Sequence, residues 1–121
     1  MEPLNLVIYH NDPGTAQALA VSLSKYFRSV NVAKRHEEVR VTVKRHGADV
    51  LVLDVETSRS DEIGCLHHEF PSLSIVVTHR LADDHLWTEA MNQGASDVCE
   101  PRDDEVVRSV LRDRMHHAAA A

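Results

Sequence analysis

The chain has 121 residues, of which 43% are hydrophobic and 26% are charged, and its formal net charge at pH 7 is -6. This length and composition are typical of one soluble globular domain with its own core. The negative charge argues against direct binding of nucleic acid, and no apolar run approaches the roughly 20 residues of a membrane span. Because the two cysteines form no metal or redox motif and no signal peptide precedes the first apolar run, we expect a reduced, cytoplasmic protein.

The first half of the chain alternates short apolar runs with helical patterns. Residues 4–9 are apolar and partly β-branched, which predicts a strand, and residues 12–27 start with an Asp-Pro pair and continue at helical spacing. Residues 30–33 predict a second short strand. Residues 37–46 fit either a strand or a helix, but Gly47 is a natural helix stop and a parallel strand needs a crossover connection, so a helix is favoured.

The third strand is the most informative stretch of the second half. It runs from about Val50 to Asp54, and its continuous apolar run ends in a single acid, which predicts a strand buried on both faces. A short helix before Pro71 and a strand over residues 73–78 follow. A carboxylate at the end of such a strand is either a functional group or an acid with a local hydrogen-bond partner, and Asp54 is therefore the first candidate site residue.

Two helices and a very short strand complete the chain. A helix begins at Asp83 or Asp84 and stops at Gly94, and its expected inner face carries Leu86, Trp87, Ala90 and Met91. Residues 97–99 predict the fifth strand. The last helix begins with acidic residues, which suit a helix N-terminus, and its expected buried face carries Val106, Val107, Val110 and Leu111.

Five strands alternating with five helices predict a three-layer α/β sandwich around a five-stranded parallel sheet. The usual single-domain solution is flavodoxin-like, with strand order 2-1-3-4-5. We expect this domain to span residues 1–115 and residues 116–121 to form a disordered tail. In this order ligands bind where the carboxyl ends of the first and third strands adjoin. The side chains expected around that crevice are those of His10, Asn11, Asp12, Asp54, Thr78, His79 and Glu100.

Four segments together resemble the receiver domain of two-component response regulators, and the resemblance covers nearly the whole chain. They are the strand that ends at Asp54, the strand that ends at Thr78, the turn over residues 94–97, and Pro101. The resemblance implies that Asp54 is the phosphoacceptor and Thr78 the switch hydroxyl. Glu56, in the loop after Asp54, and Pro101 then belong to the same crevice.

The resemblance also implies a role and partners. The role is phosphorelay signal transduction through protein–protein contacts, and the domain is not itself an enzyme. A sensor histidine kinase or another signalling protein is the expected partner, with no direct contact to nucleic acid or membrane. A homodimer or partner contact is expected on the face made by the fourth helix, fifth strand and fifth helix, where Trp87, Arg108, Arg112 and Asp113 lie.

The chain departs from the family pattern where charge matters most. The acidic pair that holds Mg²⁺ in the family is His10-Asn11 here, and the family lysine before the proline is Glu100. Mg²⁺ prefers carboxylates and water, so only a weak Mg²⁺ site is expected, at Asn11, Asp12 and Asp54. Phosphoryl transfer depends on positioning and charge neutralisation. We therefore expect a pseudo-receiver with impaired Mg²⁺-dependent phosphorylation.

Two other function classes are open. Two imidazoles and two carboxylates at strand ends, from His10, Asp54, His79 and Glu100, suit Zn²⁺, and this makes a metal-binding or pH-sensing module the alternative. Against it, the four side chains can point apart and be separately hydrated. A flavodoxin-like cofactor binder is the weakest class, because the turn after the first strand has one glycine, Gly14, and no phosphate cradle.

Overall fold

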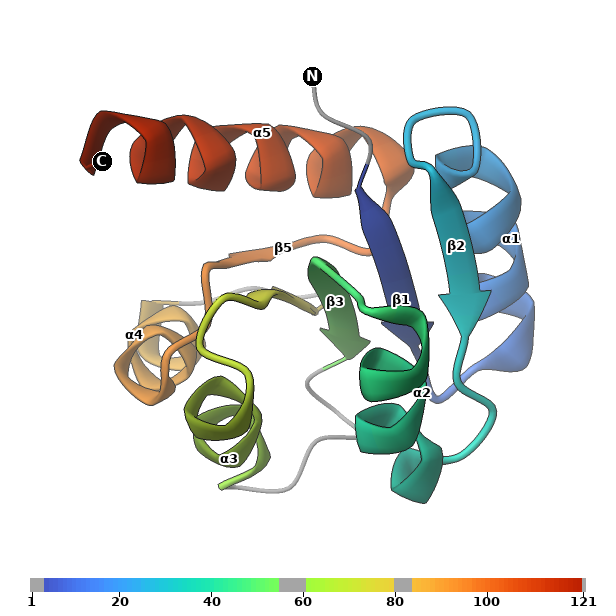
Figure 1. Ribbon diagram of the computed structural model, residues 1–121, viewed down its shortest axis with the longest axis horizontal. Coiled ribbons are helices and arrows are strands. Elements are labelled where there is room, and N and C mark those ends of the chain that lie inside the picture. The colour runs from blue at the N-terminus through green and yellow to red at the C-terminus, as the bar shows by residue number, and fades with distance from the viewer. Residues whose placement is uncertain (1–3, 55–60, 80–83, 121) are drawn as a thin grey trace.

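The computed structural model describes residues 4–54, 61–79 and 84–120, and within them five strands form one parallel sheet in the order β2-β1-β3-β4-β5 (Figure 1). This confirms the predicted strand order. The elements in chain order are β1 (Asn5–Tyr9), α1 (Pro13–Leu23), β2 (Ser29–Val32), the 3₁₀ turn η1 (His36–Glu38), α2 (Val39–His46), β3 (Val50–Asp54), α3 (Glu62–Glu69), β4 (Ser74–Thr78), α4 (Asp84–Gln93), β5 (Asp97–Cys99) and α5 (Asp103–Ala120).

Two apolar clusters, one on each face of the sheet, make the molecule three layers thick. On one face α1 and α5 pack against alternate residues of the central strands, represented by Leu6 and Ile8 of β1. On the other face α2, α3 and α4 pack against the remaining residues, represented by Val7, Leu51 and Leu53. Every residue of β3 and β4 is buried, as expected for strands covered on both faces.

Local sequence signals explain how two helices begin and end. Asp12 lies before α1 in an extended conformation and its carboxylate accepts the backbone N–H of Gly14, while Pro13 occupies the first helical position. Gly47 ends α2 with φ 56° and ψ 48°, a left-handed conformation in which glycine avoids the strain of a side chain. The ambiguous segment before Gly47 is therefore the helix that the sequence favoured.

The two longest predicted helices have different ends in the structure. α1 ends at Leu23 and not near residue 27, and Phe27 is buried from the turn that follows the helix. α5 continues to Ala120, so residues 116–120 have a helical backbone where we expected a disordered tail. Alanine has the highest helix propensity, which favours continuation of α5 through this alanine-rich segment.

Two exposure predictions, those for Trp87 and Leu111, were wrong. The Trp87 side chain on α4 is 47% exposed, and Ala90 is the buried residue of that helix. Leu111 on α5 is 39% exposed, whereas Ser109 is buried with Val106 and Val110.

None of the helices in the described part of the chain is both long and apolar enough to span a membrane.

Candidate functional site

The carboxyl ends of β1, β3 and β4 bring the first site residues together. Tyr9 of β1 is in register with Leu53 of β3, and Asp54 of β3 is in register with Thr78 of β4. His10 follows Tyr9 directly. One edge of the sheet therefore carries His10, Asp54 and Thr78 from three adjacent strands, as the sequence predicted.

Asp54 is a buried carboxyl group, with only 4% of the residue exposed. Removing a carboxylate from water is costly unless neighbouring groups compensate for the lost hydration. One such group is His10, whose Nε2 lies 3.9 Å from Asp54 Oδ1, with both side chains more than nine-tenths buried. This distance is beyond a direct hydrogen bond but within the range of a charge or dipole contact.

The orientation of the His10 ring is set by the backbone of the following turn. The backbone N–H of Asp12 donates a hydrogen bond to His10 Nδ1 at 3.0 Å. A ring nitrogen that accepts a hydrogen bond carries no proton, so the proton of the neutral imidazole is on Nε2. His10 therefore presents an N–H donor toward Asp54.

The Asp12 carboxylate is engaged with the start of α1. Its Oδ2 accepts the hydroxyl of Thr15 at 2.7 Å, and its Oδ1 accepts the Gly14 N–H at 3.3 Å. These two bonds, the Thr15 bond first, hold the pKa of the Asp12 carboxyl below its usual value. Asp12 thus acts as the N-cap of α1.

Thr78 is buried completely at the end of β4, at 0% exposure. Within the part of the chain that the structure describes, its Oγ1 has no hydrogen-bond partner. A buried hydroxyl normally has one, and leaving it unpaired costs stability. The hydroxyl is therefore available to a group that enters the crevice beside Asp54.

The other predicted site residues that the structure describes are more exposed than Asp54 and Thr78. Glu100 is exposed and lies 3.6 Å from the Arg102 guanidinium, which approaches Asp104 and Glu105 as well. Asn11 is exposed, Pro101 and His79 are partly exposed, and the His79 backbone N–H donates to the Cys99 carbonyl. Glu56 lies outside the described residues.

No metal centre forms from these groups. Across residues 4–54, 61–79 and 84–120, no group of three or more histidine, cysteine, aspartate or glutamate side chains is placed to hold a metal ion. The predicted Zn²⁺ site at His10, Asp54, His79 and Glu100 was therefore wrong, because a position at a strand end does not fix where a side chain points. The described residues do not fit Mg²⁺ either, since Asp12 caps α1 and His10 directs an N–H into the crevice.

The Cys99 side chain is buried at the end of β5. Burial is the main cause that raises the pKa of its thiol to about 11, partly offset by a hydrogen bond with Ser109. The thiol is therefore protonated at neutral pH, and a protonated thiol is a poor nucleophile. Cys65, the other cysteine, is exposed on α3.

Solved structures of known proteins share this architecture over nearly the whole chain. A response regulator from Thermotoga maritima matches with a TM-score of 0.81 at 22% identity, covering 93% of this chain and 98% of that one. The signal receiver domain of the putative response regulator NarL from Mycobacterium tuberculosis matches at 0.76 and 18% identity, covering 93% and 96%. The chain has the fold of a response regulator receiver domain.

A CheY-like protein, tadZ, from Pseudomonas aeruginosa PAO1 has the same receiver fold, with a TM-score of 0.72 and 26% identity over 93% of this chain and 94% of that one. No protein-family model matches the sequence, and no curated protein matches it significantly. At such identities the likeness establishes the fold, and the chemistry of the crevice has to be argued from its own residues.

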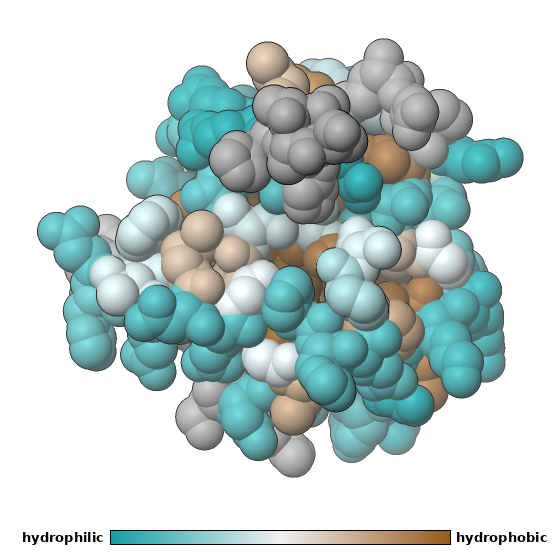
Figure 2. Space-filling model, turned by 60° about the vertical axis from the view of Figure 1, so that its left-hand side comes forward, coloured by the Kyte–Doolittle hydropathy of each residue, from teal (hydrophilic) through white to brown (hydrophobic). Residues whose placement is uncertain are grey.

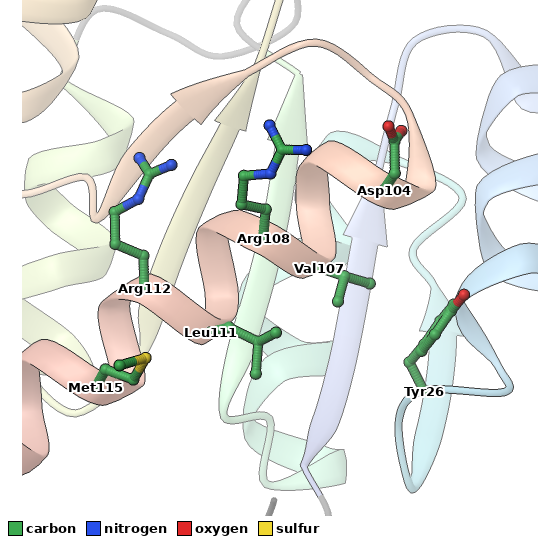
Figure 3. Close-up of a pocket in the computed structure, with 7 residues that line it drawn as sticks. All are labelled: Tyr26, Asp104, Val107, Arg108, Leu111, Arg112 and Met115. Carbon is green, nitrogen blue, oxygen red and sulfur yellow. The ribbon is translucent and has the colours of Figure 1, made fainter.

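The receiver fold here also carries a groove that sequence reasoning missed. It has a volume of about 510 Å³ and runs along α5 beside the turn after α1, away from the crevice (Figure 3). Figure 3 shows the side chains of Arg108, Leu111, Arg112 and Met115 along α5, with Tyr26 coming from the turn after α1. The sequence analysis did not predict this groove, because it assigned Leu111 to the buried face of α5.

Proposed function

We propose that this chain is a receiver-type module of two-component signal transduction that acts through protein–protein contacts and is not itself an enzyme. Asp54 is its phosphoacceptor position, and its Mg²⁺-dependent phosphorylation is impaired. The observation that carries the proposal is the buried Asp54 carboxyl in register with Thr78, whose buried hydroxyl has no partner among the described residues. A hydroxyl so placed can donate to an oxygen of a phosphoryl group carried by Asp54.

The impairment follows from the charges around Asp54. A phosphoryl group brings negative charge into a site that already holds a carboxylate, and transfer depends on cations or donors that neutralise it. Glu100 stands where the family carries a lysine, and Asp12 is engaged with α1. His10, directly after β1, offers Asp54 an N–H group and not a cation, and its Nε2 is 3.9 Å from Asp54 Oδ1.

Partners are inferred from the face made by α4, β5 and α5. Trp87 of α4 is half-exposed, and Arg112 of α5 donates a hydrogen bond to Asp97 of β5 at 3.1 Å, which ties the helix to the strand. Figure 2 turns the side that carries α4 toward the viewer, and hydrophilic side chains cover most of it with smaller hydrophobic areas among them. We propose a homodimer or a histidine kinase or other signalling protein as the occupant of this face.

The decisive experiment is incubation with acetyl phosphate and Mg²⁺, followed by intact mass. We expect slow or no gain of one phosphoryl group, and none in Asp54→Asn. Rapid Mg²⁺-dependent gain that Asp54→Asn abolishes would make the domain a conventional receiver and refute the impairment. Gain that persists in Asp54→Asn would remove Asp54 from the proposed role.

A further inference from the structure

The crevice holds an imidazole where a receiver fold offers carboxylates to a cation. We propose that His10 is a positioning residue that takes the place of the divalent cation: its Nε2–H faces Asp54 and keeps Mg²⁺ out of the crevice. The resting state of the domain is then independent of metal. This inference deepens the function proposed above, because it concerns the group that faces the phosphoacceptor position.

The first support is the path by which the His10 ring is fixed. The Asp12 carboxylate is bonded to Gly14 N–H and Thr15 Oγ, so the turn before α1 is held to the helix. The Asp12 backbone N–H in turn donates to His10 Nδ1. These hydrogen bonds run from the start of α1 through Asp12 to His10, and they fix one tautomer and one orientation of its ring.

The second support is the space between His10 and Asp54. Nε2 and Oδ1 are 3.9 Å apart, and only 8% and 5% of the two side chains are exposed. Mg²⁺ needs six oxygen ligands at about 2.1 Å and usually keeps several of its waters. An octahedral hydrated ion does not fit between two buried atoms at this separation, and the proton on Nε2 would point at it.

The third support is the state of Asp12, the one acid of the turn after β1. A carboxylate that already accepts two hydrogen bonds at a helix N-terminus would lose both by turning toward a cation. In the described residues of this turn, no other carboxylate can replace it. His10 at the position of a family acid and the hydrogen-bonded carboxylate of Asp12 therefore both weaken the binding of a cation in the crevice.

Two measurements on the intact chain test this inference, neither of which uses a phosphodonor. The first is Mg²⁺ calorimetry on the wild type, on His10→Asp, and on His46→Asp, which makes the same charge change at an exposed position of α2. We expect no binding to the wild type or His46→Asp at millimolar Mg²⁺, and measurable binding to His10→Asp, because Mg²⁺ is held by one or two carboxylates. Equal binding by the wild type and His10→Asp, or no binding by either, would overturn the inference.

The second measurement is nitrogen NMR of the His10 ring in the wild type, at a slightly alkaline pH where free imidazole is neutral. We expect an unprotonated Nδ1 and a protonated Nε2, with the Nε2 signal displaced in Asp54→Asn. A proton on Nδ1 would contradict the inference even if His10→Asp failed to fold. Because both measurements omit phosphate, they can succeed or fail independently of the role of Asp54 in phosphorylation.

Discussion

Replacement of Gly94 by alanine tests how α3 and α4 pack. Gly94 follows α4 with φ 109°, and a Cβ added there would lie 2.6 Å from Cγ and Cδ2 of the His67 ring and 3.0 Å from its Cβ. A side chain at this φ is strained by roughly 1–3 kcal/mol. Forcing atoms into a packed contact adds a cost of similar size, so we expect Gly94→Ala to lower the unfolding free energy by about 2–4 kcal/mol.

Gly47 provides the matched control, because it has φ 56° and an added Cβ would meet nothing within 4 Å. Gly47→Ala should cost only about 1 kcal/mol, the strain of a left-handed residue. Urea unfolding followed by circular dichroism measures both. In the background of Gly94→Ala, His67→Ala should recover part of the loss by removing the two ring atoms. If Gly94→Ala costs no more than Gly47→Ala, or the second substitution recovers nothing, the packing argument is wrong.

Two further predictions concern the crevice turn and the proposed partner face. Asp12→Ala should lower thermal stability at neutral pH and leave the response to Mg²⁺ unchanged. Hydrogen bonds from Thr15 and Gly14 lower the pKa of the Asp12 carboxyl in the folded protein, so the stability that the carboxylate contributes is lost as the pH falls through this lowered pKa. The melting temperatures of variant and wild type should therefore converge in strong acid. A difference that persists there contradicts this prediction. Trp87→Ala should weaken self-association or partner capture, whereas Val41→Ala, at a 48% exposed position of α2, should change neither. If the wild type sediments as a strict monomer and Trp87→Ala leaves partner capture unchanged, the face made by α4, β5 and α5 is not the contact surface.

Much of the fold could be predicted because buried parallel strands leave a strong pattern. The run that ends at Asp54 is buried at every position, and Gly47 ends the helix before it as the sequence suggested. Helix ends and faces were harder to predict. Phe27 continues the helical spacing of α1 but is buried from a turn, and the exposure of Trp87 depends on a rotation of α4 that the spacing does not fix.

The sequence predicted which residues lie at the ends of neighbouring strands, but it did not predict where each side chain points. Strand order places His10, Asp54 and Thr78 at one edge, since neighbouring parallel strands end together. Glu100 also follows a strand, yet it is exposed beside Arg102. Asp12 offered two roles in the sequence, helix cap and metal ligand, and the hydrogen bond from Thr15 selects the cap.

The receiver fold and the charges inside its crevice are separate properties of this chain. The fold needs apolar strands and helices, and all of these are retained on both faces of the sheet. Phosphoryl transfer needs neutralising charge at one strand end, where this chain has a hydrogen-bond donor on His10 in place of an acid that could hold a cation. Because Asp54 is buried beside His10, the hydration that its carboxyl group loses on burial must be compensated by groups of the protein. If the proposal for His10 holds, the central carboxyl of this fold needs no metal ion, and the calorimetry of His10→Asp decides the point.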